Sequence, residues 1–379
     1  WASMNIMETT TMITISYNDL RKFTIEENSH NNSIIIDKIG KAFGREHPES
    51  LGILAVTDVP TLAEKRLRLL PLARKIAMLP DKTEIISEES NFQSGWSHGK
   101  EIFAGKPDLA KGSFYANPLV DDITTIRKNI PKSLQEANPG FFAPNVWPTQ
   151  SMPEFQSAFQ ELGKLVVDVG RLVAQPCDYY VSQRCAGYSP NKLSNLLQGS
   201  HYCKGRLLHY FPLEKSTNGE NDSNDFSGWC GWHNDHGSLT GLIPGLYLDE
   251  NGQSTSIASN DKSGLYIQAR NGSIHHVVLP ENSIGFQIGE TSQIHSGGIL
   301  QATPHAVRGS TDSALTRESF AVFMEPEFHG DMTLPLDKTV EDIQDASISL
   351  PSSVKTLSSR WKKGMNFGEF SAATFSAFY

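Results

Sequence analysis

The second half of the chain breaks into short strand-like runs separated by turn signals, and this alternation constrains the fold more than any other feature. Asn251-Gly252 and Asn271-Gly272 are typical of tight hairpin turns, because these residues readily adopt positive φ. Many short strands joined by such turns fit an antiparallel barrel or a double-sheet jelly roll. The predicted strands are 207–211, 238–242, 265–269, 275–279 and 320–324.

Helices are predicted to flank this mainly β region. Between residues 152 and 175 the apolar side chains recur every three or four residues, as one face of a long amphipathic helix requires. Upstream, the apolar run 52–57 predicts a strand, and Thr61 with Glu64 predicts a capping box that starts a helix. We therefore expect a sheet that packs on a long helix.

Composition narrows the class of partner. The formal net charge is −9, which disfavours attraction to nucleic acid or to an anionic membrane, so the expected partner is a small molecule. No apolar segment approaches the roughly 18 residues needed to span a bilayer, and a cytoplasmic location is expected. The oligomeric state stays open.

A basic cluster and the four cysteines are interpreted as structural features and not as binding or metal sites. The basic cluster at 65–75 alternates with leucines and predicts the solvated face of an amphipathic helix that Pro71 interrupts or kinks. The four cysteines are too irregularly spaced for a zinc knuckle and are expected to be buried, reduced thiols. They are Cys177, Cys185, Cys203 and Cys230.

His233, Asp235 and His305 form a candidate metal site. His233 and Asp235 are separated by one residue, so on an extended segment both side chains project to the same face. A distant strand of the same barrel could supply His305. Two imidazoles and one carboxylate make the facial triad that binds non-haem Fe(II) and leaves the opposite positions open. A His-X-Asp pair alone would be weak evidence.

A second pair strengthens the hypothesis. Arg317 and Ser319 are also two residues apart, so both donors can face one side of a strand. A guanidinium binds a carboxylate through two parallel charge-assisted hydrogen bonds, and a serine hydroxyl can add another. This pair would suit the distal carboxylate of a 2-oxo diacid whose other end chelates the metal.

Taken together, these motifs resemble the Fe(II)/2-oxoglutarate-dependent dioxygenases of the isopenicillin N synthase-like group. The resemblance implies a double-stranded β-helix (jelly-roll) core, His233, Asp235 and His305 as iron ligands, Arg317 and Ser319 as the 2-oxoglutarate anchor, and O2 as the second co-substrate. The matched pieces are 208–212, 233–235, 264–268, 287–290, His305 and 317–319, and more weakly 52–60 and 105–108.

Two departures from the pattern leave alternatives open. His305 and Arg317 are 12 residues apart, longer than expected, so Arg308 is a second-choice anchor. A phenol that the family often places near the co-substrate is replaced by Phe211. Tyr210 is the substitute that we assign to co-substrate binding, although on a strand it faces the side opposite to Phe211.

The resemblance also suggests a division of the chain. We expect residues 4–150 to form an α/β segment that packs on the core and contributes substrate loops. Residues 151–379 would form the helix-backed catalytic core, and the two parts one integrated domain. The stretch 214–227 is predicted to be a flexible loop near the site, and 365–379 either a helix over the pocket or a packed terminus. Candidate substrate-binding residues are His98, Lys100, Tyr115, Asn145, Arg206 and Arg308.

The implied function is oxidation of an aliphatic C–H bond of a small molecule, by hydroxylation, desaturation or ring closure, coupled to conversion of 2-oxoglutarate to succinate. One alternative is an oxidative cyclase of natural-product biosynthesis, similar to the kainoid synthases of algae. Another is a non-catalytic jelly roll that binds zinc or senses a diacid, since His and Asp ligands also accept zinc.

Overall fold

Two β-sheets form the centre of the protein. The computed structural model describes residues 6–7, 12–23, 30–103, 106–213, 229–259, 261–310, 312, 314–344 and 350–378. The larger sheet has the order β2-β3-β14-β10-β16-β8-β7-β4, with β11 paired to β10, and the smaller has the order β1-β13-β12-β15-β9. A two-stranded ribbon of β5 and β6 lies apart from both.

The strands are mostly short, as the alternation of apolar runs and turns predicts. All five predicted strands are present, each with shifted ends. Their bounds are β1 Ile6–Met7, β2 Thr14–Ser16, β3 Ile53–Thr57, β4 Gly95–His98, β5 Ile102–Phe103, β6 Lys106–Pro107, β7 Lys111–Ala116, β8 Cys203–Tyr210, β9 Cys230–His233, β10 Leu239–Leu248, β11 Ser254–Thr255, β12 Gly264–Gln268, β13 Ile274–Val277, β14 Ile284–Ile288, β15 His305–Arg308 and β16 Thr316–Met324.

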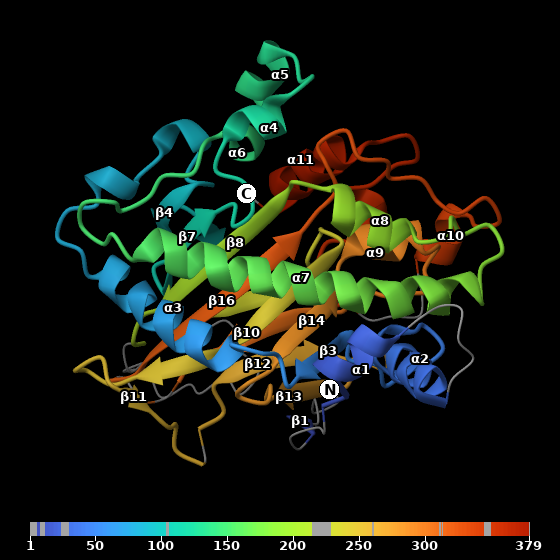
Figure 1. Ribbon diagram of the computed structural model, residues 1–379, viewed down its shortest axis with the longest axis horizontal. Helices are drawn as coiled ribbons and strands as arrows, with labels where there is room; N and C mark the ends of the chain where they lie inside the picture. Colours follow the sequence, from blue (N-terminus) through green and yellow to red (C-terminus); the bar gives the residue numbers. More distant parts are fainter. Residues whose placement is uncertain are drawn as a thin grey trace.

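Helices α3 and α7 lie across one face of the larger sheet (Figure 1). The periodic segment predicted as a helix is α7, which runs further than expected and buries one side against this sheet. The helices are α1 Tyr17–Lys22, α2 His30–Phe43, α3 Leu62–Ala77, α4 Ile123–Arg127, α5 Lys132–Ala137, α6 Pro139–Phe142, α7 Phe155–Ser182, α8 Lys192–Gly199, α9 Glu290–His295, α10 Val340–Ile343 and α11 Phe367–Phe378, with short 3-10 turns at Thr83–Ile85, Glu88–Ser90 and Leu357–Ser359.

Alternation along β16 shows how the larger sheet separates the core from the site. Phe320, Val322 and Met324 point into the apolar core that contains α7. The alternate residues Arg317 and Ser319 point to the other face, where both line a cavity. Strands of the smaller sheet also line this cavity, so it lies between the two sheets of the jelly roll. The predicted fold class is confirmed.

Strands from the N-terminal part belong to the same sheet as strands from the second half. β3 pairs with β14, and β7 pairs with β8, so residues on both sides of position 150 share one hydrogen-bonded sheet. The division near residue 150 stays a prediction. The predicted loop 214–227 lies outside the described residues. Within the part of the chain that the structure describes, no helix has the length and apolar character needed to cross a bilayer.

Two local predictions around α3 are wrong, and a third is wrong in part. Thr61 precedes the helix with a left-handed φ of 62° and makes no side-chain capping hydrogen bond, so the capping box is not formed. Pro71 lies inside α3 and does not interrupt it, while a kink at this residue stays a prediction. Arg66 belongs to the basic cluster yet is buried, because its guanidinium donates hydrogen bonds to the carbonyls of Pro244 and Gly245.

Candidate active site

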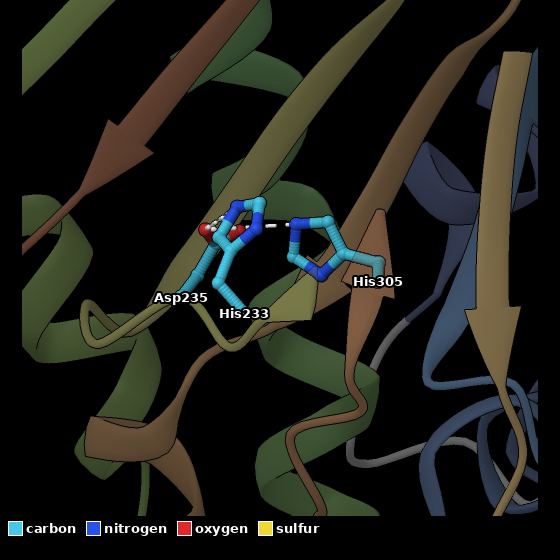
Figure 2. Close-up of side chains that lie close together, drawn as sticks. All are labelled: His233, Asp235 and His305. Atoms are coloured by element: carbon cyan, nitrogen blue, oxygen red, sulfur yellow. Dashed lines mark ion pairs between the residues drawn. The ribbon is translucent and has the colours of Figure 1, made fainter. Parts of the chain in front are cut away.

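Three side chains converge where β9 and β15 run side by side. His233 and His305 are opposite each other on these antiparallel strands, and Asp235 follows two residues after His233. The Nε2 atoms of His233 and His305 lie 3.9 and 3.8 Å from Oδ1 of Asp235. One ligand atom from each residue lies within 4.8 Å of the other two, and Figure 2 shows the side chains pointing toward one another. The strand pairing thus brings together residues 70 positions apart.

The hydrogen bonds of these side chains fit a metal ion. Nδ1–H of His233 donates to the Gly231 carbonyl at 2.8 Å, which directs Nε2 to the centre of the site. Burial opposes protonation of His233, but Cys230 and Asp235 outweigh it and raise its pKa to about 9, so a metal ion would displace a proton from Nε2. His305 is held in the same way by the Thr303 carbonyl at 3.3 Å, and burial lowers its pKa to about 4, so it is neutral near pH 7. Oδ2 of Asp235 is buried and has no hydrogen-bond partner among the described residues.

A cavity of about 200 Å³ lies between the sheets on one side of this triad. Arg317, Ser319 and Tyr210 line it together with His233 and His305. Arg317 is opposite Tyr210 in the β16–β8 register, and its guanidinium carbon lies 5.3 Å from the centre of the phenol ring. No described carboxylate forms an ion pair with Arg317. The predicted anchor residues are therefore brought into one pocket with the triad.

Strand alternation separates the two candidate anchor arginines. On β15, His305 and Val307 face the smaller cavity, whereas Arg308 is not among the described residues that line either cavity. Its guanidinium instead lies near the Tyr266 hydroxyl on the neighbouring strand β12. The second-choice role of Arg308 and its role in substrate binding stay predictions, which this placement outside both cavities does not support. Tyr210 faces the cavity despite its predicted strand parity.

A larger cavity of about 290 Å³ lies on the other side of His233 and Asp235. Three of the predicted substrate residues, Tyr115, Asn145 and Arg206, line it. Two others do not: the rings of His98 and Phe211 stack at 4.8 Å, and Lys100 Nζ lies 4.1 Å from the centre of the Phe92 ring. His98 is on β4, the edge strand of the sheet, and its exposed side chain points away from the site.

Most charges at one end of the larger cavity neutralise each other. Glu101, which the sequence did not single out, receives Arg206 Nη2 at 2.6 Å, Lys111 Nζ at 3.1 Å and the Tyr115 hydroxyl at 2.8 Å. Burial opposes ionisation of Glu101, but Arg206 and Lys111 outweigh it and lower its pKa to about 2. Arg206 therefore already has a protein carboxylate as its partner.

Two further charged residues, Lys204 and Glu325, line the floor of the larger cavity. Burial raises the pKa of Glu325 to about 7 and lowers that of Lys204. Neither residue was predicted to be part of the site. For Glu325 the sequence held a signal, the continued alternation from Arg317 and Ser319 through Phe323 to Glu325, which places all four on one face of the strand.

The C-terminal segment covers the larger cavity. It contains helix α11, whose Ser371, Thr374 and Phe375 line that cavity, so of the two alternatives left open by the sequence the structure has the helix over the pocket. Arg360 forms a buried bidentate ion pair with Glu290 at 2.6 and 2.7 Å. Glu290 also accepts a hydrogen bond from Asn234, between the two triad residues. This network connects the C-terminal segment to the part of the chain that carries His233 and Asp235.

The cysteines make no disulfide. All four are free, and three are buried as predicted. Cys230 differs, because it is only half-buried, lines both cavities and has its sulfur 3.9 Å from Nδ1 of His233. The prediction of a buried thiol is wrong at this one position, since the register of β9 and β15 shifts between His233 and Cys230 and brings both side chains to the site.

Comparisons with solved structures place this fold among oxygenase structures. A scan of protein-family models gives no match, and no curated protein matches the sequence. A 2OG-Fe(II) oxygenase family protein from Caulobacter crescentus matches with a TM-score of 0.63 and 16% identity, over 98% of this chain and 100% of the other. The full-length Neurospora crassa protein in complex with α-KG and thymine also gives 0.63 and 16%, over 97% and 96%.

A third structure, the rice dioxygenase for auxin oxidation, matches with a TM-score of 0.55 and 17% identity over 97% of this chain and 95% of the other. Identities this low show a shared fold, which spans nearly the whole chain. They confirm the predicted jelly-roll architecture, while membership of the isopenicillin N synthase-like group stays a prediction.

Proposed function

We propose that this protein is an Fe(II)- and 2-oxoglutarate-dependent oxygenase that oxidises an aliphatic C–H bond of a small molecule. One observation carries the proposal: the two cavities meet at His233 and Asp235, and only the smaller contains Arg317 and Ser319. Such an arrangement provides separate places for a diacid co-substrate and a main substrate on two sides of one metal site.

The residues have distinct roles in this proposal. His233, Asp235 and His305 would hold Fe(II), which when bound supplies the oxidative chemistry with O2 and 2-oxoglutarate. Arg317 and Ser319 would bind the distal carboxylate of 2-oxoglutarate, and Tyr210 would line its pocket. The orphaned Oδ2 of Asp235 and the convergence of the two Nε2 atoms on this residue support metal binding. Solved structures of the same fold contain α-KG, and one contains 2OG, Fe and JA.

The proposal is tested by measuring succinate formation from 2-oxoglutarate with Fe(II), O2 and a panel of small molecules. We expect at least one compound to stimulate succinate release, and omission of Fe(II) or its replacement by zinc to abolish it. Tight zinc retention without any succinate formation would contradict the proposal and favour the metal-binding sensor.

The oxidative cyclase remains an alternative within the same chemistry. Both reactions require the same metal and co-substrate, so the triad and Arg317 do not separate them. The mass of the product does: gain of one oxygen supports hydroxylation, whereas loss of two hydrogens supports ring closure or desaturation. A role in natural-product biosynthesis would follow only from the second result together with the identity of the substrate.

A further inference from the structure

Lys204 and Glu325 are neighbours on the floor of the larger cavity. In the β8–β16 register Lys204 lies opposite Phe323, and the backbone N–H of Glu325 donates to the Tyr202 carbonyl at 3.1 Å. Residues opposite each other, and residues two apart on one strand, share a face of the sheet. Lys204 and Glu325 are therefore diagonal neighbours on the face that lines the cavity, with Phe323 beside them.

Neither group forms a close ion pair with a described Asp, Glu, Lys or Arg, although the charges of Lys204 and Glu325 attract each other at longer range. Lys204 Nζ reaches only Gln93 Oε1 at 3.4 Å and the Gly140 carbonyl at 3.2 Å, and no described carboxylate forms an ion pair with it. Glu325 is 9% exposed, and its carboxylate accepts no hydrogen bond from a described residue. Its nearest polar contact is Nε2 of His236, at 3.7 Å. The adjacent Tyr202 hydroxyl is also buried without a hydrogen-bond partner in the described chain.

Charges withdrawn from water without close partners are costly, and a ligand that pairs with both the half-buried Lys204 and the buried Glu325 would reduce that cost. An apolar ligand would exclude water from both groups without compensating either. A ligand with one charge would leave the other group unpaired. A zwitterion satisfies both, because its anionic group can pair with the ammonium and its cationic group with the carboxylate.

We propose, on the basis of the function proposed above, that the main substrate is an amino acid whose carboxylate binds Lys204 and whose ammonium group binds Glu325. The other cations of the cavity limit its side chain. Arg206 and Lys111 are already paired with Glu101, so among the lysines and arginines of the described cavity lining only Lys204 is left for a substrate carboxylate. Phe141, Phe323 and Phe375 also line the cavity. The substrate side chain is therefore uncharged and partly apolar.

Calorimetry on the full-length protein tests this inference without turnover. The protein is loaded anaerobically with Fe(II) and 2-oxoglutarate and titrated with each of the twenty standard L-amino acids. For any that binds, its N-acetyl derivative and its carboxamide are titrated as well. We expect at least one free amino acid to bind, and each masked form to bind at least about tenfold more weakly. Absence of binding by all twenty, or equal binding of the masked forms, overturns the inference.

Two variants assign each end of the ligand to its residue. Glu325→Gln should abolish the preference for the free amine over the N-acetyl form and keep the preference for the carboxylate. Lys204→Met should do the reverse. A merely structural role would weaken all three ligands in parallel, and that result contradicts the assignment. The matched controls are Glu154→Gln and Lys164→Met, exposed positions at the start and on the outer face of α7, which should bind as the wild type does.

The failure of this inference is distinguishable from failure of the proposed function. Protein that forms a visible charge-transfer band with Fe(II) and 2-oxoglutarate but binds no amino acid contradicts the substrate class alone. Protein that forms no such band contradicts the oxygenase function itself. The masked derivatives of the bound amino acid provide the test on wild-type protein even if a variant does not fold.

Discussion

The two cavities on either side of the metal site are built differently. The smaller one lies between the sheets and presents Arg317, Ser319 and Tyr210 from paired strands. The larger one is completed by segments far apart in the chain, including the loop around Asn145 and helix α11. We propose that the cavity built from strands binds the co-substrate, whose binding does not depend on the main substrate, and that the peripheral segments of the larger cavity select the main substrate.

The largest expected effect is at the triad, because the proposed metal serves both cavities. Asp235→Ala should lower iron affinity by more than about 100-fold and abolish succinate formation, since a second-shell substitution alone costs 10–100-fold. Iron content after dialysis and the rate of succinate release measure the two effects. Arg308→Met is the matched control, because Arg308 lines neither cavity. Normal turnover by Asp235→Ala would show that the reaction does not depend on a metal ion bound by this triad.

The Arg360–Glu290 ion pair links the C-terminal segment to the loop that carries His233 and Asp235. Its removal should affect both the stability of the protein and the larger cavity. Arg360→Met leaves Glu290 buried without its bidentate partner, at a cost of about 3–5 kcal/mol in the free energy of unfolding. Urea unfolding of the metal-free protein measures this loss. The control Arg68→Met breaks an exposed ion pair with Glu161, which should cost less than about 1 kcal/mol. Equal losses would show that the buried network is unimportant.

The two cavities also differ in how much of each could be predicted from the sequence. The pairs His233/Asp235 and Arg317/Ser319 could be identified because residues two apart on a strand share a face, whatever the neighbouring strand. Placement of Arg308 and His98 required knowing which face of β15 is internal and that β4 is an edge strand. Strand register is set by long-range pairing, and local sequence does not reveal it.

The same dependence on strand register explains why several residues of the larger cavity were not predicted from the sequence. Lys204 and Glu101 appear in the sequence as ordinary polar residues of the chain. Only the pairing of β7 with β8 brings Lys111 and Arg206 near Glu101, and only the pairing of β8 with β16 brings Lys204 near Glu325. The long helix and the short strands, in contrast, depend on local periodicity and were predicted.

Burial of Glu325 gives the larger cavity a pH dependence of its own. Its pKa rises from 4.5 to about 7 on folding, so the folded protein binds the proton more tightly. The contribution of Glu325 to stability must therefore fall as pH rises from about 4.5 through 7, by roughly 3 kcal/mol. Glu325→Gln should remove this slope, so that the variant gains stability relative to wild type at pH 8 but not at pH 4. Parallel unfolding curves at both pH values would contradict this prediction.

A smaller effect is expected from the hydroxyl that supports Glu101. Tyr115→Phe removes one hydrogen bond to the carboxylate and should lower the free energy of unfolding by about 1.5 kcal/mol. The 2-oxoglutarate affinity should not change, because Tyr115 lines the larger cavity alone. Tyr17→Phe is the control, at a half-buried tyrosine outside both cavities. Weakened 2-oxoglutarate binding in Tyr115→Phe would show that the cavities are not independent.

One anaerobic titration tests whether the smaller cavity binds 2-oxoglutarate. Fe(II)-loaded wild type, Arg317→Met and Arg308→Met are titrated with 2-oxoglutarate while the visible charge-transfer band is recorded. We expect a saturable band with the same Kd in wild type and Arg308→Met, and a Kd at least about tenfold higher in Arg317→Met, since a charge-assisted bond contributes about 1.5–3 kcal/mol. No band in the wild type, or weakening in Arg308→Met alone, would contradict it.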